Sequence, residues 1–152
     1  MISEKLTKQC AQNNTLIEMH VPDFSIAKEF YSKLGFSVVW ESPANNKDGY
    51  LVMQRKHCIL CFWPGNETVL DQSYFKRFPK NTKRGYGVEI VIMAENIDNL
   101  YKTAKQQINV VEELKMQPWG ARDFRVEDPF GFYLRFTEAY NVLVKNDPLQ
   151  EK

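Results

Sequence analysis

The sequence lacks any long apolar run, and none approaches the roughly 20 residues that a helix needs to span a bilayer. It also lacks an excess of charge of one sign, because 20 Lys and Arg residues stand against 19 Asp and Glu residues. A nearly neutral chain has no net field to attract nucleic acid or an anionic membrane. We therefore expect neither a nucleic-acid nor a membrane partner, and we expect any ligand to be held at a local site.

Cysteine is scarce, with only Cys10, Cys58 and Cys61. An odd number this small does not suit a disulfide framework, and no leader-like apolar stretch opens the chain, so we expect a cytoplasmic protein. Cys58 and Cys61 lie in the strand-like run HCILCFW. Residues three apart on a strand point to opposite faces, so the two thiols are not expected to share a metal or a disulfide. Two buried small residues are the simpler prediction.

Common catalytic signatures are missing as well. The chain has no glycine-rich phosphate loop, and no Ser or Cys nucleophile has a recognisable His partner in its sequence context. With 152 residues and 43% apolar content, the chain is long enough to bury a core but short for two independent domains. We expect one domain that spans residues 1–152.

The first half of the chain reads as βαβββ. Residues 15–21 alternate, with Ile17, Met19 and Val21 on one face and Leu16, Glu18 and His20 on the other. Asp23 is suited to N-cap a helix that ends at Gly35. Three strand-like runs follow at 36–41, 50–54 and 57–63, with a turn predicted over 42–49.

The second half repeats this order. A strand at 88–94 precedes a helix that starts after Asn96, and strands at 108–113, 122–127 and 132–138 follow. Asn96 lies 73 residues after Asp23, at the same place between first strand and helix. Such repetition indicates duplication. We predict module one at 14–63, a connection at 64–84, module two at 85–140 and a tail at 141–152.

The predicted fold class is α+β, with tandem βαβββ modules that form a curved, open-barrel mixed sheet with helices on its convex side. One such module buries only one face of its sheet, so two modules together would leave a concave surface. The mouth of a curved sheet is a natural place for a small-molecule ligand.

Three segments carry a resemblance to a known family: VPDFSIAKEFYSKLGF, AENIDNLYKTA and QPWGARDFRVEDPFGFYLRFTE. Over roughly residues 14–140 the chain resembles the vicinal oxygen chelate superfamily of glyoxalases, bleomycin-resistance proteins and dioxygenases. It is most similar to the metal-free, bleomycin-resistance-like branch. The resemblance implies paired modules, a homodimer with grooves, and a small-molecule ligand.

The same resemblance places three of the four family metal positions at Leu16, Glu89 and Arg135. Leucine has no donor atom, and arginine is a fixed cation that repels a metal. We therefore expect no metal and no other cofactor. The alternative is a displaced metal site that uses Glu18, His20 and Glu89.

Aromatic residues are the other feature that the resemblance assigns. Trp40, Tyr50 and Trp119 match groove positions, where flat rings stack on planar ligands. The alternative for these rings is ordinary core packing. We predict that Glu89 and Arg135 pair across the groove and that Arg135 is available to a ligand carboxylate, phosphate or carbonyl. His20 is a further candidate for the groove, although a satisfied strand histidine is the common case.

The first functional hypothesis is a metal-independent binding protein that captures a planar or aromatic ligand, rather than an enzyme. Its site residues would be Trp40, Tyr50, Trp119, Arg135, Glu89 and His20. The alternative is a metal-dependent glyoxalase- or dioxygenase-type enzyme with displaced ligands. A third possibility is an interaction module whose own side chains fill the groove. The balanced charge argues against a strongly cationic drug as the ligand.

Overall fold

The computed structural model describes residues 15–45, 48–64 and 72–143. Contacts divide the chain into two compact units. Unit 1 comprises Met1–Lys28 and Phe36–Phe78, and unit 2 comprises Glu29–Gly35 and Pro79–Lys152. In the described part of the chain, no helix is both long enough and apolar enough to cross a membrane.

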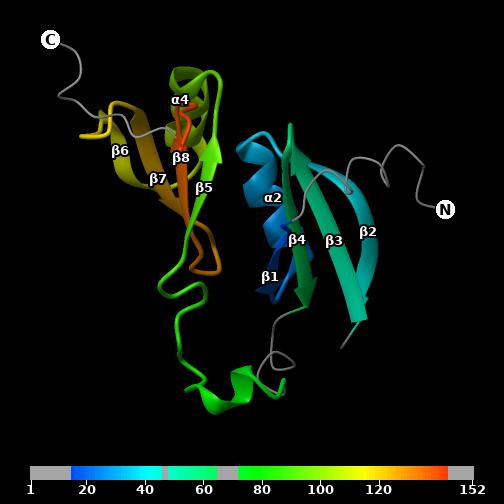
Figure 1. The fold of residues 1–152 in the computed structure, drawn as a ribbon. Coiled ribbons are helices and arrows are strands. Elements are labelled where there is room, and N and C mark those ends of the chain that lie inside the picture. Colours follow the sequence, from blue (N-terminus) through cyan, green and yellow to red (C-terminus); the bar gives the residue numbers. More distant parts are fainter. Residues whose placement is uncertain (1–14, 46–47, 65–71, 144–152) are drawn as a thin grey trace, which may run out of the picture. The chain divides into compact units, whose positions relative to one another are not determined.

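The sheet of unit 1 has four strands in the order β1-β4-β3-β2 (Figure 1). Strand β1 runs parallel to β4, and the other neighbours are antiparallel. The elements are β1 (Ile17–Val21), α2 (Phe24–Lys33), β2 (Ser37–Asn45), β3 (Asp48–Arg55), β4 (Cys58–Pro64) and the short 3-10 helix η1 (Phe75–Arg77). The βαβββ order predicted for the first half is confirmed.

The helix-capping residues and the alternation predicted in the first half are found in the structure. The Asp23 carboxylate accepts hydrogen bonds from the backbone N–H groups of Ser25 at 2.7 Å and Ile26 at 3.1 Å, which caps α2. Gly35, after the helix, has a φ of 83°, a conformation that glycine adopts without strain. Met19 and Val21 of β1 are buried, as the alternation predicted.

The turn predicted over residues 42–49 is wrong. β2 continues to Asn45 and β3 already begins at Asp48, with Ser42 paired to Tyr50. The segment predicted as a turn contains Pro43. A residue without a backbone N–H is nevertheless tolerated in β2, because β2 is an outermost strand. Gly49 has a φ of 139°, and a Cβ there would lie 2.6 Å from the Cα of Ala44, so this close approach of β3 to β2 requires glycine.

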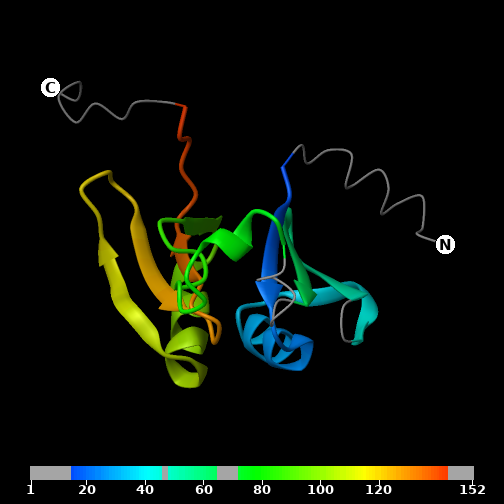
Figure 2. The same ribbon diagram turned by 90° about the horizontal axis from the view of Figure 1, so that it is seen from below.

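Unit 2 has the same topology, with its sheet in the order β5-β8-β7-β6 and β5 parallel to β8. Its elements are β5 (Glu89–Met93), α4 (Ile97–Gln107), β6 (Val110–Met116), β7 (Arg122–Glu127) and β8 (Tyr133–Thr137). Figure 2 shows β6 and β7 as a long curved hairpin. Asn96 caps α4, because its side-chain oxygen accepts from the N–H of Asn99 at 3.1 Å. The predicted repetition of element order is confirmed.

Alternation in unit 2 separates an apolar face from a polar one. The buried core positions of three strands are Ile90, Ile92, Phe124, Val126, Leu134 and Phe136. Residues between them on each strand point to the opposite face. Arg125 of β7 and Arg135 of β8 lie directly opposite each other in this register, and Val91 of β5 pairs with Arg135 on its other side. This second face carries most of the charged groups of the site.

The Asp-Pro-x-Gly turn between β7 and β8 is held by Asp128, which is buried. Its carboxylate accepts from the backbone N–H groups of Phe130 at 2.9 Å and Phe132 at 2.8 Å, and from the Tyr31 hydroxyl at 2.8 Å. Burial raises the pKa of Asp128, and these hydrogen bonds oppose that shift. The turn thereby fixes where β8 begins, and with it the position of Arg135 along the sheet.

Candidate functional site

Arg125 is the centre of a charged network on the polar face of unit 2. Its Nε donates to Glu89 of β5 at 2.7 Å, and its Nη1 donates to Glu112 of β6 at 2.9 Å and to Asp123 of β7 at 3.1 Å. Its side chain is only 11% exposed. One guanidinium thus binds carboxylates from three strands. We call Glu89, Glu112, Asp123, Arg125 and Arg135 the carboxylate–guanidinium network.

Further hydrogen bonds fix the carboxylates of this network. Tyr133 of β8 donates to Glu112 at 3.0 Å, and this bond, with the nearby Arg125 charge, lowers the pKa of Glu112. Gln117 donates to Asp123 at 2.7 Å. Burial disfavours the charge on Arg125, but its bond to Glu89 and the surrounding carboxylates raise its pKa overall. The network thus favours the charged forms of both Glu112 and Arg125.

Arg135 is held far less tightly than Arg125. Its Nε lies 3.7 Å from a Glu89 oxygen and its Nη1 lies 3.9 Å from Asp123 Oδ2, both beyond hydrogen-bond distance. The ion pair between Glu89 and Arg135 that the sequence predicted is present, although Arg125 is the closer partner of Glu89. Within the described residues, the buried atoms Arg135 Nε and Asp123 Oδ2 have no hydrogen-bond partner.

Two aromatic residues enclose Arg135. Its Cζ lies 5.3 Å from the ring centroid of Trp119, within the range of a cation–π contact. Its Nη2 donates to the Tyr140 hydroxyl oxygen at 3.4 Å, a long hydrogen bond. Trp119 lies in the turn before β7 and is 40% exposed, and Tyr140 follows β8. The sequence predicted Trp119 but not Tyr140.

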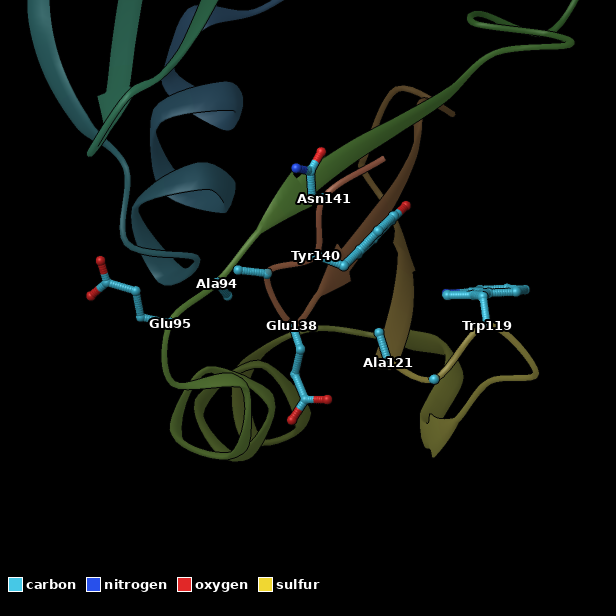
Figure 3. Close-up of a pocket in the computed structure, with 9 residues that line it drawn as sticks. Ala94, Glu95, Trp119, Ala121, Glu138, Tyr140 and Asn141 are labelled. Carbon is cyan, nitrogen blue, oxygen red and sulfur yellow. The ribbon is translucent and has the colours of Figure 1, made fainter. Parts of the chain in front are cut away.

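Both rings line a pocket of about 520 Å³ in unit 2 (Figure 3). We call it the Trp119 pocket, and its lining residues are Ala94, Glu95, Trp119, Gly120, Ala121, Glu138, Ala139, Tyr140 and Asn141. Four of these have little or no side chain, which leaves room at the ends of β5 and β8. The Glu138 carboxylate binds Arg122 at 2.7 Å. The volume suits a small organic ligand.

The predicted residues of unit 1 form a separate, aromatic group. The Tyr50 hydroxyl donates to Glu18, and burial, followed by the hydrogen bonds to Cys61 and Glu18, raises the Tyr50 pKa. The Trp40 ring lies 6.1 Å from the Tyr50 ring and is exposed. The His20 ring contacts the rings of Trp63 and Phe75. The structure thus brings Trp40 and Tyr50 together in unit 1, and Glu89, Arg135 and Trp119 together in unit 2.

Cysteine placement partly corrects the sequence prediction. Cys61 is buried, as expected, but Cys58 is half-exposed. Ile17 pairs with Leu60 in unit 1 as Ile90 pairs with Leu134 in unit 2, so Cys61 is the unit 1 counterpart of Arg135. Sequence reasoning could have found this position by aligning the last strands of the two halves.

The residues at the metal positions do not fit a metal site. Leu16 offers no donor atom, and the Arg135 guanidinium repels a cation. The two Glu89 oxygens face Arg125 and Arg135. No group of three His, Cys, Asp or Glu side chains suited to hold a metal occurs among residues 15–45, 48–64 and 72–143.

Comparisons with known proteins agree with this architecture. The sequence model of the glyoxalase/bleomycin resistance protein/dioxygenase superfamily matches residues 15–136. No curated protein sequence matches the chain.

Several solved structures are similar in fold. The hypothetical protein SA1046 from S. aureus is 20% identical, with a TM-score of 0.65 over 84% of this chain and 94% of that chain. UcmS2 is 21% identical, with a TM-score of 0.65 over 84% and 99%. A bleomycin-binding protein in complex with bleomycin is 17% identical, with a TM-score of 0.56 over 84% and 99%. At these identities the likeness shows a shared fold.

Proposed function

The chain belongs to the glyoxalase/bleomycin resistance protein/dioxygenase superfamily, and we propose that within it the chain is a metal-independent binding protein for a small planar or aromatic molecule. One observation carries the proposal. Arg135 stands at a position that the family resemblance assigns to a metal ligand, and it lies beside Glu89, which the tightly bound Arg125 also contacts. The two guanidinium groups supply positive charge beside the carboxylates there.

The same observation argues against the enzymatic alternative. A displaced metal site would need Glu18, His20 and Glu89 as ligands. Glu18 accepts the Tyr50 hydroxyl hydrogen bond in unit 1, and Glu89 is bound by Arg125 in unit 2. A carboxylate that is already engaged must give up its partner before it can bind a metal, which weakens metal affinity.

The Trp119 pocket supports the binding role. Its size suits a small organic molecule, and the exposed Trp119 ring offers a flat apolar surface at its wall. Trp40 and Tyr50 of unit 1 offer a second pair of rings. A similar structure is a bleomycin-binding protein with its drug, which supports small-molecule capture on this fold. The proposal includes a cytoplasmic homodimer, as expected from the sequence.

Trp119→Ala tests the proposal directly. Screening of the full-length protein against a library of planar aromatic compounds, with native mass spectrometry and calorimetry as readouts, should find ligands whose affinity falls at least about tenfold in the variant, since a lost aromatic contact in a pocket is worth about 1.4 kcal/mol or more. Tyr86→Ala, which changes an exposed ring outside the pocket, is the matched control and should leave affinity unchanged.

Metal analysis of the same protein, purified without chelator, separates the two functions. The binding protein should carry less than about one tenth of an equivalent of Zn, Ni, Mn or Fe after dialysis, because its engaged carboxylates are poor ligands. A stoichiometric metal that resists dialysis would contradict the proposal and favour the enzyme.

A further inference from the structure

We infer that the ligand presents a neutral oxygen acceptor, such as an amide or ketone carbonyl, to Arg135, and that this oxygen takes the place of the Tyr140 hydroxyl. The inference rests on the proposed function and names the chemical class of its ligand. It narrows the expectation from sequence, which allowed a carboxylate or phosphate as well.

The first argument is the contrast between the two arginines. Arg125 donates through its Nε and Nη1 to three carboxylates at 2.7, 2.9 and 3.1 Å. Arg135 has polar contacts of 3.4, 3.7 and 3.9 Å, although its side chain is only 14% exposed. A largely buried guanidinium with unused N–H groups is costly, and an incoming acceptor relieves that cost. Arg135 is therefore the donor that the site offers to a ligand.

The second argument is the charge already present. Glu89, Glu112 and Asp123 contribute three formal negative charges, and Arg125 and Arg135 contribute two positive ones. Lys115, whose Nζ lies 3.6 Å from Glu112, adds a third positive charge, so the formal charges of the site already balance. An anionic ligand would bring a further negative charge close to Glu89 and to Asp123, whose side chain is fully buried. Like charges at short distance in a poorly solvated site repel strongly. A neutral acceptor avoids this repulsion.

The third argument is the hydrogen-bond acceptor that Arg135 has in the structure. The Tyr140 hydroxyl, a neutral oxygen, is the acceptor that Arg135 Nη2 uses. Tyr140 and Trp119 line the Trp119 pocket and both contact Arg135, which is not itself among the lining residues. A ligand oxygen from the pocket therefore reaches Arg135 by taking the place of the Tyr140 hydroxyl. The bond of 3.4 Å is long and therefore weak. A carbonyl oxygen is a stronger acceptor than a phenol oxygen and can displace it.

A series of three naphthalene compounds tests the inference on the full chain. 2-Naphthamide carries a neutral carbonyl, 2-naphthoate carries a carboxylate, and naphthalene carries neither. Isothermal calorimetry should show 2-naphthamide binding at least about tenfold more tightly than either of the others, a difference of about 1.4 kcal/mol. Tighter binding of 2-naphthoate, or equal binding of all three, would overturn the inference.

Two variants assign the effect to the residues named. Arg135→Met should abolish the advantage of 2-naphthamide over naphthalene, and Tyr140→Phe should increase 2-naphthamide affinity by removing the competing oxygen while leaving naphthalene affinity unchanged. Lys33→Met, which breaks only an exposed pair with Glu29, is the control. If Arg135→Met fails to fold, Tyr140→Phe decides the question, and an unchanged or lower 2-naphthamide affinity would contradict it.

The outcomes also distinguish a failure of this inference from a failure of the proposed binding function. If all three compounds bind equally and Trp119→Ala abolishes their binding, the binding function stands and the neutral-acceptor inference fails. If none of the three binds, or if binding is unaffected by Trp119→Ala, the proposed site itself is wrong.

Discussion

Arg125 and Arg135 are paired residues on the neighbouring strands β7 and β8, but their polar contacts differ. Arg125 closes a set of short hydrogen bonds from three strands, whereas Arg135 sits beside the same carboxylates at longer range. An arginine that makes short hydrogen bonds to carboxylates of three strands stabilises the fold, whereas an arginine whose polar contacts are all long is available to a ligand. The contrast predicts opposite results for stability and binding.

Arg125→Met should lower the free energy of unfolding by about 3 kcal/mol, because it leaves the buried Asp123 and its neighbours without their main counter-charge. Arg135→Met should change it by less than about 1 kcal/mol, since Glu89 and Asp123 keep Arg125. Urea denaturation followed by circular dichroism measures both. Equal losses of stability in the two variants would contradict a structural role for Arg125 and a binding role for Arg135.

At the scale of elements, local signals predicted the fold well. The caps Asp23 and Asn96 and the alternation of β1 needed no tertiary information, because each depends on a few neighbouring residues. The failure at residues 42–49 has a different origin. Whether Pro43 ends a strand depends on whether that strand has one neighbour or two, and sequence order does not reveal this.

The site was predicted only in part, for a related reason. Glu89, Arg135 and Trp119 matched family positions, whereas Asp123, Arg125 and Glu112 did not. The sequence did carry a signal for Asp123 and Arg125. Both flank the buried Phe124 in β7, so they must lie on the sheet face that Arg135 occupies. Tyr140 lies beyond β8, where no period applies, so its contact with Arg135 follows only from the three-dimensional path of the chain.

The β7–β8 turn provides a prediction about Asp128. Asp128→Ala should lower the free energy of unfolding by about 2 kcal/mol, because the buried Tyr31 hydroxyl and two half-buried backbone N–H groups lose their acceptor. Asp128→Asn keeps an oxygen for the two backbone N–H groups and should cost less. Thermal unfolding of both variants tests this order. An alanine variant as stable as the asparagine variant would show that the hydrogen bonds do not hold the turn.

The raised pKa of Asp128 adds a pH dependence. A carboxyl group whose pKa is higher in the folded than in the unfolded protein destabilises the fold once pH exceeds that range. The wild type should therefore lose stability relative to Asp128→Asn as pH rises from below the unfolded pKa through the folded pKa. Chemical denaturation of both proteins at a series of pH values measures the difference, and the opposite slope would contradict the assignment.

Arg122 ties three elements together and predicts the opposite slope. It binds Asp98 in the first turn of α4 at 2.9 Å and Glu138 after β8 at 2.7 Å, and its hydrogen bonds lower the pKa of both carboxyls. Such groups stabilise the fold above their unfolded pKa, and this stability is lost as pH falls through the folded pKa. The stability difference between wild type and Arg122→Gln should therefore shrink in acid. A difference that does not change with pH would exclude these pairs as its source.

At the scale of the whole molecule, the two units share a topology but differ in chemistry. Strand order, the parallel pair and the helix position repeat, and the counterpart of Arg135 in unit 2 is Cys61 in unit 1. Unit 1 carries Trp40 and Tyr50, and unit 2 carries the charged network and the Trp119 pocket. The two units are equivalent scaffolds, and the candidate residues of one are mainly aromatic whereas those of the other are mainly charged.

The last prediction concerns assembly and starts from β5, the outermost strand at one edge of its sheet. Val91 and Met93 of this strand are 40% and 43% exposed, and Val88 just before it is 58% exposed. An outermost strand with apolar side chains invites a partner, and a second copy related by a two-fold axis is the commonest solution. Native mass spectrometry at tens of micromolar should therefore give twice the 17.8 kDa chain mass. The double variant Val91→Lys, Met93→Lys should shift the protein to monomer, because two buried lysines without partners oppose association. Val111→Lys on β6, at the other edge of the same sheet, should leave the dimer intact. A wild-type monomer, or a dimer lost only in the β6 variant, would contradict β5 as the contact strand.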